Sequence, residues 1–468
     1  PERVAVDEDD RRTTYAELDE RSDRLASALL GLGLSRGDLV ATLSGSSGEH
    51  VVAFFACAKA GLGLVPLNWR LAPAELAFQL DDSRPAVFLV EPQHAELADE
   101  ALRHASADPQ RHELGAELGG HGAPAEEPQD EDPLLVVYTS GTTGRPKGAV
   151  LTHANCFWTN LSFDLATGVH GDDVVLQVLP QFHCGGWNVQ PLLAWWKGAT
   201  VVLERAFDPA RCLDLIERKR VTTMMGVPAN YQFMAQEPAF ASTDLSSLAR
   251  VVVGGAPMPQ PVLDAWQERG VTIVQGYGLT EAAPNVIYAG RPYPYVELAL
   301  RDPSSGELLD GAATGELLVR GPNVFAGYLR RPDETAAAFV DGWLRTGDVA
   351  ERSGDGSYRI RDRLKEMYIS GGENVYPAEV ETALHEHPAV SDVAVVAVPD
   401  ERWGEAGVAF VVAAAEVTAD ELREFCRERL AHYKVPREIR FVDALPRSAM
   451  NKVLKDELAA SLEPEAVA

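Results

Sequence analysis

The chain has 468 residues, of which 46% are hydrophobic and 24% are charged. These proportions are typical of a folded protein with more than one packing unit, and they exclude collagen-like, wholly disordered and disulfide-stapled chains. Asp and Glu outnumber Lys and Arg by 70 to 42, which gives a formal net charge of −28. Because a field of this sign repels phosphate backbones and anionic lipid, duplex nucleic acid and membrane surfaces are unfavourable partners.

The first hundred residues alternate between helix-like and strand-like patterns. Leucines at helical spacing predict a helix over 15–32, and apolar runs predict strands at 38–43 and 63–67 on either side of a helix at 51–60. The segment 105–133 is polar and rich in Pro and Gly, which predicts a surface connection without regular structure. This βαβ rhythm predicts an α/β fold with a mostly parallel sheet.

The rest of the chain divides into three parts. Further apolar strands indicate a second α/β layer over 134–290. Gly and Asp turns between short strands predict a small β-rich subdomain over 295–360. A helix over 377–385 and a strand after it predict a last, small α+β unit.

The cysteines are few and scattered. They are Cys57, Cys156, Cys184, Cys212 and Cys426. An odd set without a CxxC pair predicts reduced thiols in a cytoplasmic protein, and the spacings match no common zinc pattern. No stretch has the roughly 18 uninterrupted apolar residues of a membrane span, and no signal peptide is visible.

A loop rich in glycine and hydroxyl groups follows a predicted strand directly, over residues 138–148. Glycines let backbone N–H groups approach an anion, while hydroxyls and an ammonium group add donors, so the loop suits a polyphosphate. It is not a Walker A loop, because Lys147 is followed by Gly148. Its candidate nucleotide-binding residues are Thr139, Ser140, Gly141, Thr142, Thr143, Gly144 and Lys147.

This segment resembles the phosphate loop of the adenylate-forming superfamily, which contains acyl-CoA synthetases, the adenylation domains of peptide synthetases and beetle luciferases. The resemblance covers nearly the whole chain, since further motifs recur in the expected order, and it is closest to fatty- and aryl-acid CoA ligases. It implies a large N-terminal domain over 1–362 and a small mobile domain over 366–468, with Lys365 as the hinge.

The segment 275–281 resembles the family motif that binds adenine, phosphate and metal. The resemblance implies that Tyr277, followed by Gly278, stacks on adenine, that Thr280 contacts the phosphate and that Glu281 holds Mg²⁺. A carboxylate just after a small, hydroxyl-bearing turn is chemically suited to a metal–phosphate group.

Three further motifs resemble the family's nucleotide contacts. Gly255 and Ala256 resemble the adenine-side loop, where small side chains let the purine pack on backbone. Asp348 resembles the residue that accepts both ribose hydroxyls, and Arg363 the residue that contacts ribose or phosphate.

Two residues resemble those that handle the acid. Lys452 resembles the catalytic lysine that bridges the substrate carboxylate and the α-phosphate, although Asn451 replaces the Gly that many members have before it. A fixed cation there would stabilise the approach of two anionic groups. His183 resembles a histidine that gates or lines the acid pocket; we interpret it as a binding residue, because the acid is already ionised at neutral pH.

The acceptor of the activated acid is predicted to be CoA. Gly371 and Gly372 resemble the wall of the pantetheine tunnel, and Trp403 and Tyr433 resemble positions that contact the CoA nucleotide. The main hypothesis is therefore an AMP-forming acid–CoA ligase that uses ATP, Mg²⁺ and CoA. A ligase that loads a carrier protein's phosphopantetheine arm is the alternative, and a nucleotide-binding regulator without catalysis is a third.

The acid itself is predicted from the candidate pocket residues. They are His183, Trp187, Gly226, Gly255, Ala256, Gly278 and Ala282. Several are small and none supplies an obvious counter-charge for a polar tail. This composition favours a sizeable apolar acid, which is fatty, aryl or polycyclic.

Overall fold

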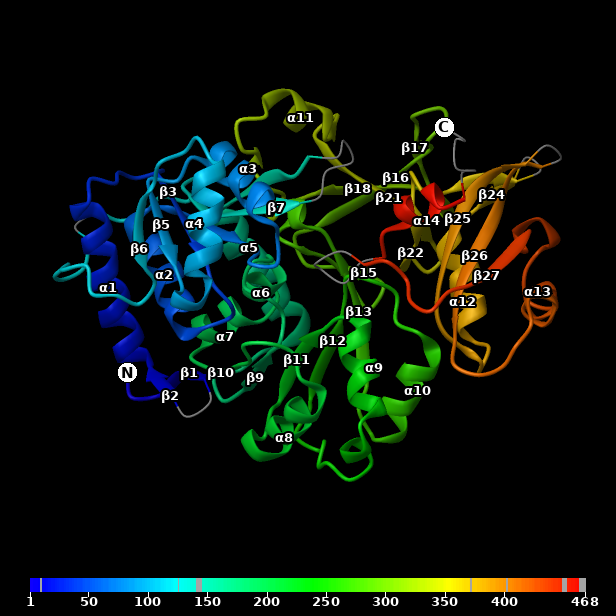
Figure 1. Cartoon of the computed structure of the whole chain (residues 1–468), viewed down its shortest axis with the longest axis horizontal. Coiled ribbons are helices and arrows are strands. Elements are labelled where there is room, and N and C mark those ends of the chain that lie inside the picture. Colours follow the sequence, from blue (N-terminus) through cyan, green and yellow to red (C-terminus); the bar gives the residue numbers. More distant parts are fainter. Residues whose placement is uncertain are drawn as a thin grey trace. The chain divides into compact units, whose positions relative to one another are not determined.

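The computed structural model describes residues 1–8, 11–124, 126–139, 145–370, 373–400, 403–447 and 453–462, and its helices and strands are shown in Figure 1. The chain separates into two units. Unit 1 consists of Pro1–Met258, Val262–Leu298 and Val319–Leu344, and unit 2 of Pro259–Pro261, Ala299–Leu318 and Arg345–Ala468. Both contain helices and strands, and the predicted α/β class is confirmed.

A seven-stranded sheet in unit 1 has the order β19-β8-β7-β4-β3-β5-β6. Its strands are β3 (Leu39–Leu43), β4 (Gly63–Leu67), β5 (Val87–Val90), β6 (Gln110–Glu113), β7 (Pro133–Thr139), β8 (Lys147–Thr152) and β19 (Gly327–Tyr328). The neighbouring helices are α1 (Tyr15–Gly31), α2 (Gly48–Ala60), α3 (Pro73–Ser83), α4 (Ala95–His104) and α5 (His153–Thr167), with the short turn η1 (Pro92–His94). Leu76 and Leu80 of α3 and Ala98 of α4 pack on Phe88 and Val65 of the strands, which buries one face of the sheet.

A nine-stranded sheet, also in unit 1, has the order β15-β14-β13-β12-β11-β9-β10-β1-β2. Its strands are β1 (Val4–Glu8), β2 (Arg11–Thr14), β9 (Val174–Gln177), β10 (Thr200–Leu203), β11 (Thr223–Gly226), β12 (Arg250–Val253), β13 (Ile273–Gly278), β14 (Asn285–Tyr288) and β15 (Arg291–Pro292). The helical segments are α6 (Gly185–Asn188), α7 (Pro191–Lys197), α8 (Pro209–Lys219), α9 (Pro228–Gln236), η2 (Pro238–Ala241), α10 (Gln260–Glu268) and η3 (Thr280–Ala282). Figure 1 shows α9 and α10 beside β11–β13, where Tyr231 and Trp266 pack on Met224 and Val251.

A third sheet of six strands has the order β17-β16-β18-β21-β20, with β22 paired to β21. Its strands are β16 (Glu297–Arg301), β17 (Leu308–Leu309), β18 (Ala313–Arg320), β20 (Phe339–Val340), β21 (Trp343–Arg352) and β22 (Tyr358–Arg363), and the helix α11 (Pro332–Ala337) precedes β20. These short strands form the β-rich segment that the sequence predicts at 295–360.

The C-terminal part of unit 2 has a sheet in the order β24-β23-β26-β25, with β27 beside β26. Its elements are β23 (Tyr368–Ser370), β24 (Glu373–Val375), α12 (Pro377–His385), β25 (Val390–Asp400), β26 (Gly404–Ala413), α13 (Ala419–Arg427), η4 (His432–Lys434), β27 (Glu438–Phe441) and α14 (Lys455–Ala460). Alternate residues of β25 point to opposite faces: Val393 and Val395 pack with α12 and α13, whereas Ala394 and Val396 pack with Leu458 of α14.

One part of the predicted organisation is wrong. The segment 105–133 is expected to lack regular structure, yet β6 pairs with β5 in parallel at the edge of the sheet. Its residues Gln110, Arg111 and Glu113 are exposed and polar, so backbone pairing forms the strand without the apolar alternation that would predict it.

Within the described part of the chain, no helix is both long and apolar enough to cross a membrane. All five cysteines are buried, and they are not joined in disulfides.

Candidate active site

The predicted phosphate loop joins two antiparallel strands of unit 1. Thr139 at the end of β7 is paired with Lys147 at the start of β8, so these two residues face each other at the base of a hairpin. Ser140, Gly141, Thr142, Thr143 and Gly144, the predicted tip of the loop, lie outside the described residues. The base of the hairpin nevertheless places one hydroxyl and one ammonium group of the motif on neighbouring strands.

Glu281 lies in η3, directly after β13, and its carboxylate contacts this hairpin. Its Oε1 atom accepts a hydrogen bond from the Tyr328 hydroxyl at 2.9 Å and a longer one from the Thr139 hydroxyl at 3.4 Å. Both donors are neutral, so these contacts orient the carboxylate without cancelling its charge. Two motifs that are 142 residues apart in sequence therefore meet in unit 1.

Tyr328 contacts two charged residues, Lys147 and Glu281. The ammonium group of Lys147 lies over its ring, 5.0 Å from the centroid, which is the geometry of a cation–π interaction. Burial, together with the neighbouring Glu281 carboxylate, raises the pKa of the Tyr328 phenol above its ordinary value. The phenol therefore stays protonated at neutral pH and remains a donor to Glu281.

Thr280 and His183 lie close to the same turn. Thr280 is buried, and its hydroxyl is 3.3 Å from the sulfur of Cys184. The N–H of Gly185 points at Nδ1 of His183 from 3.3 Å. A ring nitrogen that accepts a hydrogen bond carries no proton, so the neutral ring has its proton on Nε2. The binding role of His183 stays a prediction.

Two of the residues predicted to lie on the adenine side, Gly255 and Gly278, need glycine for different reasons. Gly255 has φ = +81°, a left-handed conformation that side chains disfavour. At Gly278 a Cβ would lie 1.5 Å from the carbonyl oxygen of Pro284, so no other residue fits the turn after β13. Tyr277 is half-buried on β13, and Ala256 is exposed beside Gly255.

Asp348 and Arg363 are partners in unit 2. They occupy paired positions on β21 and β22, and Arg363 Nε lies 2.8 Å from Asp348 Oδ1. Asp348 is 3% exposed and its backbone N–H donates to the Thr346 hydroxyl at 3.0 Å. The two residues that the motifs assign to ribose and phosphate are thus adjacent.

Charged groups that are buried or half-buried lie around the predicted hinge segment of unit 2. Burial raises the pKa of Asp362 to about 6, although its carboxylate accepts a hydrogen bond from the Ala378 N–H at 2.8 Å, at the start of α12. Lys455 lies 2.8 Å from Glu381 and 2.9 Å from Glu366. Burial disfavours the charge of Lys455, but these two carboxylates outweigh it and raise its pKa.

Three more of the predicted site residues, Gly371, Gly372 and Lys452, also lie outside the described residues. Trp403 is half-buried; its backbone N–H donates to Asp400 at 2.9 Å, and its ring centroid is 6.1 Å from that of His432.

The donor set at Glu281 fits Mg²⁺. Mg²⁺ is usually held by one or two carboxylates together with substrate phosphates and water, and not by an all-protein cage. Among the residues that the structure describes, no group of three or more His, Cys, Asp or Glu side chains is arranged to hold a metal ion. A single, charged carboxylate beside the base of a phosphate loop matches the first arrangement.

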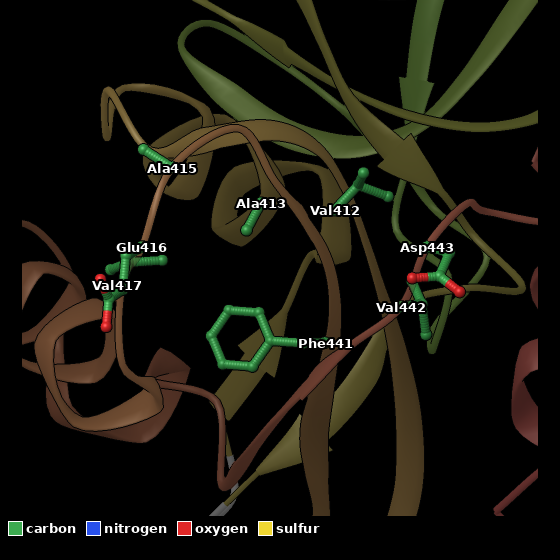
Figure 2. Close-up of a pocket in the computed structure, with 8 residues that line it drawn as sticks. All are labelled: Val412, Ala413, Ala415, Glu416, Val417, Phe441, Val442 and Asp443. Atoms are coloured by element: carbon green, nitrogen blue, oxygen red, sulfur yellow. The ribbon is translucent and has the colours of Figure 1, made fainter.

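Two cavities lie away from these residues. One, of about 410 Å³, is in unit 2 and is shown in Figure 2. It is lined by Val412, Ala413, Ala415, Glu416, Val417, Phe441, Val442 and Asp443. The other, of about 350 Å³, is lined by residues of unit 1 that include Leu30, Arg36 and Pro128. Neither contains a predicted site residue.

Part of the predicted acid pocket belongs to the core. Trp187 has no exposed surface; its ring stacks on Phe54 with centroids 4.7 Å apart, and its indole N–H donates to Gln181 O at 2.6 Å. Ala282 is also fully buried. These two side chains are therefore part of the packed interior and have no exposed surface.

Tyr328 contacts Glu281 and Cys184 contacts Thr280, but neither is among the site residues that the sequence predicts. Tyr328 follows Gly327 in a two-residue strand, and Cys184 follows His183. Neither carries a local signal, since a lone Tyr or Cys is compatible with any packed surface. Only pairing of β19 with β8 brings Tyr328 to Glu281.

The chain belongs to the family of AMP-binding enzymes. The family model of the AMP-binding enzyme matches residues 1–329, and the model of the AMP-binding enzyme C-terminal domain matches residues 379–452. The predicted resemblance to adenylate-forming enzymes is thereby confirmed.

Relatives of known name cover nearly the whole chain. A feruloyl-CoA synthase of Amycolatopsis sp is 42% identical over 98% of this chain and 96% of its own. An indoleacetate–CoA ligase of Aromatoleum aromaticum is 41% identical over 98% of this chain and 95% of its own. The o-succinylbenzoate CoA synthetase (MenE) of Bacillus subtilis, in complex with the acyl-adenylate intermediate OSB-AMP, has a TM-score of 0.87 and 33% identity over 98% of this chain and 95% of its own. The same enzyme in complex with ATP and magnesium ion has a TM-score of 0.89.

Proposed function

We propose that the protein is an ATP-dependent carboxylic acid–CoA ligase that acts through an acyl-AMP intermediate. The observation that carries the proposal is the charged carboxylate of Glu281, held by the Thr139 and Tyr328 hydroxyls at the base of a phosphate loop. Relatives with at least 41% identity over 98% of the chain are named as CoA ligases or synthases, which favours CoA over a carrier protein as the acceptor.

In the first half-reaction, an oxygen of the acid attacks the α-phosphorus of ATP, and pyrophosphate leaves. Lys147 and the loop after Thr139 would hold the phosphates, and Glu281 would hold Mg²⁺, which neutralises part of the phosphate charge. Asp348 would accept the ribose hydroxyls, and Arg363 would contact ribose or phosphate. Lys452 would bring the carboxylate and the α-phosphate together by offsetting their charges.

In the second half-reaction, the CoA sulfur attacks the acyl carbon, AMP leaves and the thiol proton goes to solvent. Gly371 and Gly372 would admit the narrow pantetheine arm, and Trp403 would contact the nucleotide of CoA. We place the boundary between the large and small domains at 362–366, with Lys365 as the hinge.

We propose an apolar acid with an aromatic ring as the substrate class. Gly255, Ala256 and Gly278, which the motifs assign to the acid pocket together with His183, carry no polar side chains. The names of the relatives at 41–42% identity contain feruloyl and indoleacetate groups, which are aromatic. The five buried cysteines, which are not joined in disulfides, favour a reducing, cytoplasmic compartment.

The test is pyrophosphate release from ATP over a panel of aryl, fatty, dicarboxylic and amino acids, followed by AMP release with free CoA or with phosphopantetheinyl carrier proteins. We expect aryl acids to give the fastest release and CoA to accept the product. A preference for amino acids or dicarboxylates would overturn the substrate class. Transfer only to carrier proteins would overturn the acceptor, and nucleotide binding without pyrophosphate release would favour the regulator.

A further inference from the structure

The segment 322–328 of unit 1, which we call the brace, contacts the turn that carries Thr280 and Glu281. The side-chain amide of Asn323 donates to the carbonyl oxygens of Ala282 and Asn285 at 2.9 and 3.0 Å. The backbone N–H of Phe325 donates to the carbonyl oxygen of Glu281 at 2.9 Å. The segment therefore holds the backbone of this turn at Glu281 and directly after it.

The brace is itself fixed at two places. The side-chain amide of Asn155, near the start of α5, donates to the carbonyl oxygens of Pro322 and Val324 at 2.9 and 2.8 Å. At its other end, Tyr328 is paired with Ala149 of β8. Because both ends are attached to regular elements, the brace positions what it carries more accurately than a free loop would.

Tyr328 is the end of the brace that reaches the charged groups. Its backbone N–H donates to the Thr335 hydroxyl at 2.9 Å, and the ring of Phe325 packs edge-on against its ring with centroids 4.9 Å apart. These contacts restrict the ring. Its hydroxyl lies 2.9 Å from Glu281 Oε1, and its face lies 5.0 Å from the Lys147 ammonium group.

We propose that Tyr328 is a positioning residue that presents the Glu281 carboxylate and the Lys147 ammonium group in a fixed relation to a bound Mg²⁺–triphosphate. The inference rests on the proposed function, since it requires that Glu281 faces the metal and Lys147 the phosphates. The hydroxyl of Tyr328 contacts the Glu281 carboxylate, and its ring face contacts the Lys147 ammonium group. Each of the two groups is therefore oriented, and both keep their charges. A metal ligand whose rotamer is held in advance needs less reordering when the metal binds.

Tyr328→Phe tests the hydroxyl alone, because the ring and its contacts with Phe325 and Lys147 remain. We expect the Mg²⁺ concentration for half-maximal pyrophosphate release to rise about tenfold, the order expected for loss of one hydrogen bond to a charged group. A readout independent of turnover is calorimetric binding of ATP without the acid. There the gain in ATP affinity on adding Mg²⁺ should shrink, while the affinity in EDTA stays unchanged.

Tyr295→Phe is the matched control, since it removes a hydroxyl from a ring that is 55% exposed in the same unit. Equal losses of ATP affinity with and without Mg²⁺, or a lower melting temperature with unchanged Mg²⁺ dependence, would overturn the positioning role. An unchanged Mg²⁺ requirement in Tyr328→Phe would do the same.

Glu281→Gln separates a failure of the inference from a failure of the proposed function. If Glu281→Gln abolishes the Mg²⁺ effect on ATP binding and Tyr328→Phe does not change it, only the inference fails. If the wild-type protein itself shows no Mg²⁺-dependent ATP binding, the proposed function fails.

Discussion

Two carboxylates that the motifs assign to the nucleotide have different surroundings in the two units. In unit 1, Glu281 accepts hydrogen bonds from two neutral hydroxyl groups, those of Thr139 and Tyr328. In unit 2, Asp348 is 3% exposed and forms an ion pair with Arg363 at 2.8 Å. Neutral donors leave a carboxylate its charge, whereas a guanidinium partner largely compensates it.

This difference in charge compensation supports the different roles that are proposed for the two carboxylates. A carboxylate whose described hydrogen-bond donors are neutral keeps its charge and attracts a divalent cation, as proposed for Glu281. A compensated carboxylate remains a good hydrogen-bond acceptor for uncharged hydroxyls, as proposed for Asp348 and ribose. Removing the charge of Glu281 should therefore reduce activity more than removing the charge of Asp348.

The largest effects are expected for Glu281→Gln and, with the same magnitude, for Lys452→Ala. The amide oxygen still accepts from the Tyr328 hydroxyl, so the fold of the turn should remain while the charge is lost. We expect pyrophosphate release to fall about 10²–10³-fold, the range for removal of one electrostatic stabiliser. Glu268→Gln, at an exposed position at the end of α10, is the control. Near-normal release at saturating Mg²⁺ would show that another group binds the metal.

Lys452→Ala should divide the two half-reactions. Its ammonium group is proposed to act only while carboxylate and α-phosphate, both anionic, approach each other. We expect ATP-dependent pyrophosphate release to fall about 10²–10³-fold, with AMP release from preformed acyl-AMP and CoA nearly unchanged. A parallel loss of both activities would indicate a shared or structural role for this lysine.

Asp362→Asn tests the buried carboxyl of unit 2. Its pKa is raised from 3.8 to about 6, so the folded state binds more protons than the unfolded state between these pH values. The contribution of Asp362 to stability therefore decreases as pH rises through this window and is constant above it, with a total of about 2–3 kcal/mol.

Urea unfolding of the wild type and of Asp362→Asn at several pH values measures this contribution. We expect the wild type to lose stability relative to the variant between about pH 4 and pH 6, the two ends of the titration window. A difference that does not change with pH would mean that Asp362 is ionised in the folded state as easily as in the unfolded state.

The smallest effect is expected for Asp348→Asn. An amide retains one acceptor for a ribose hydroxyl but no longer compensates Arg363, so the KM for ATP should rise about tenfold with kcat little changed. Steady-state pyrophosphate release at varied ATP measures it, with the exposed Asp310→Asn as control. A fall in kcat of the size expected for Glu281→Gln would erase the distinction between the two carboxylates.

Much of the candidate site was predictable because its motifs are local. Thr139 and Lys147 flank one loop, and Thr280 and Glu281 are neighbours, so residue order alone indicates phosphate and metal chemistry. The chain's membership of the AMP-binding family and its α/β class follow from the same motifs and from the alternation of apolar segments.

The tertiary structure decided which groups meet. Tyr328 is 47 residues from Glu281 and carries no motif, and it reaches the carboxylate only because β19 pairs with β8. Trp187 resembles a pocket residue in sequence, yet its stacking on Phe54 makes it part of the core. Local patterns report the chemistry of a side chain and the period of its element, whereas partners, burial and charge compensation depend on strand order, which is set by contacts between distant segments.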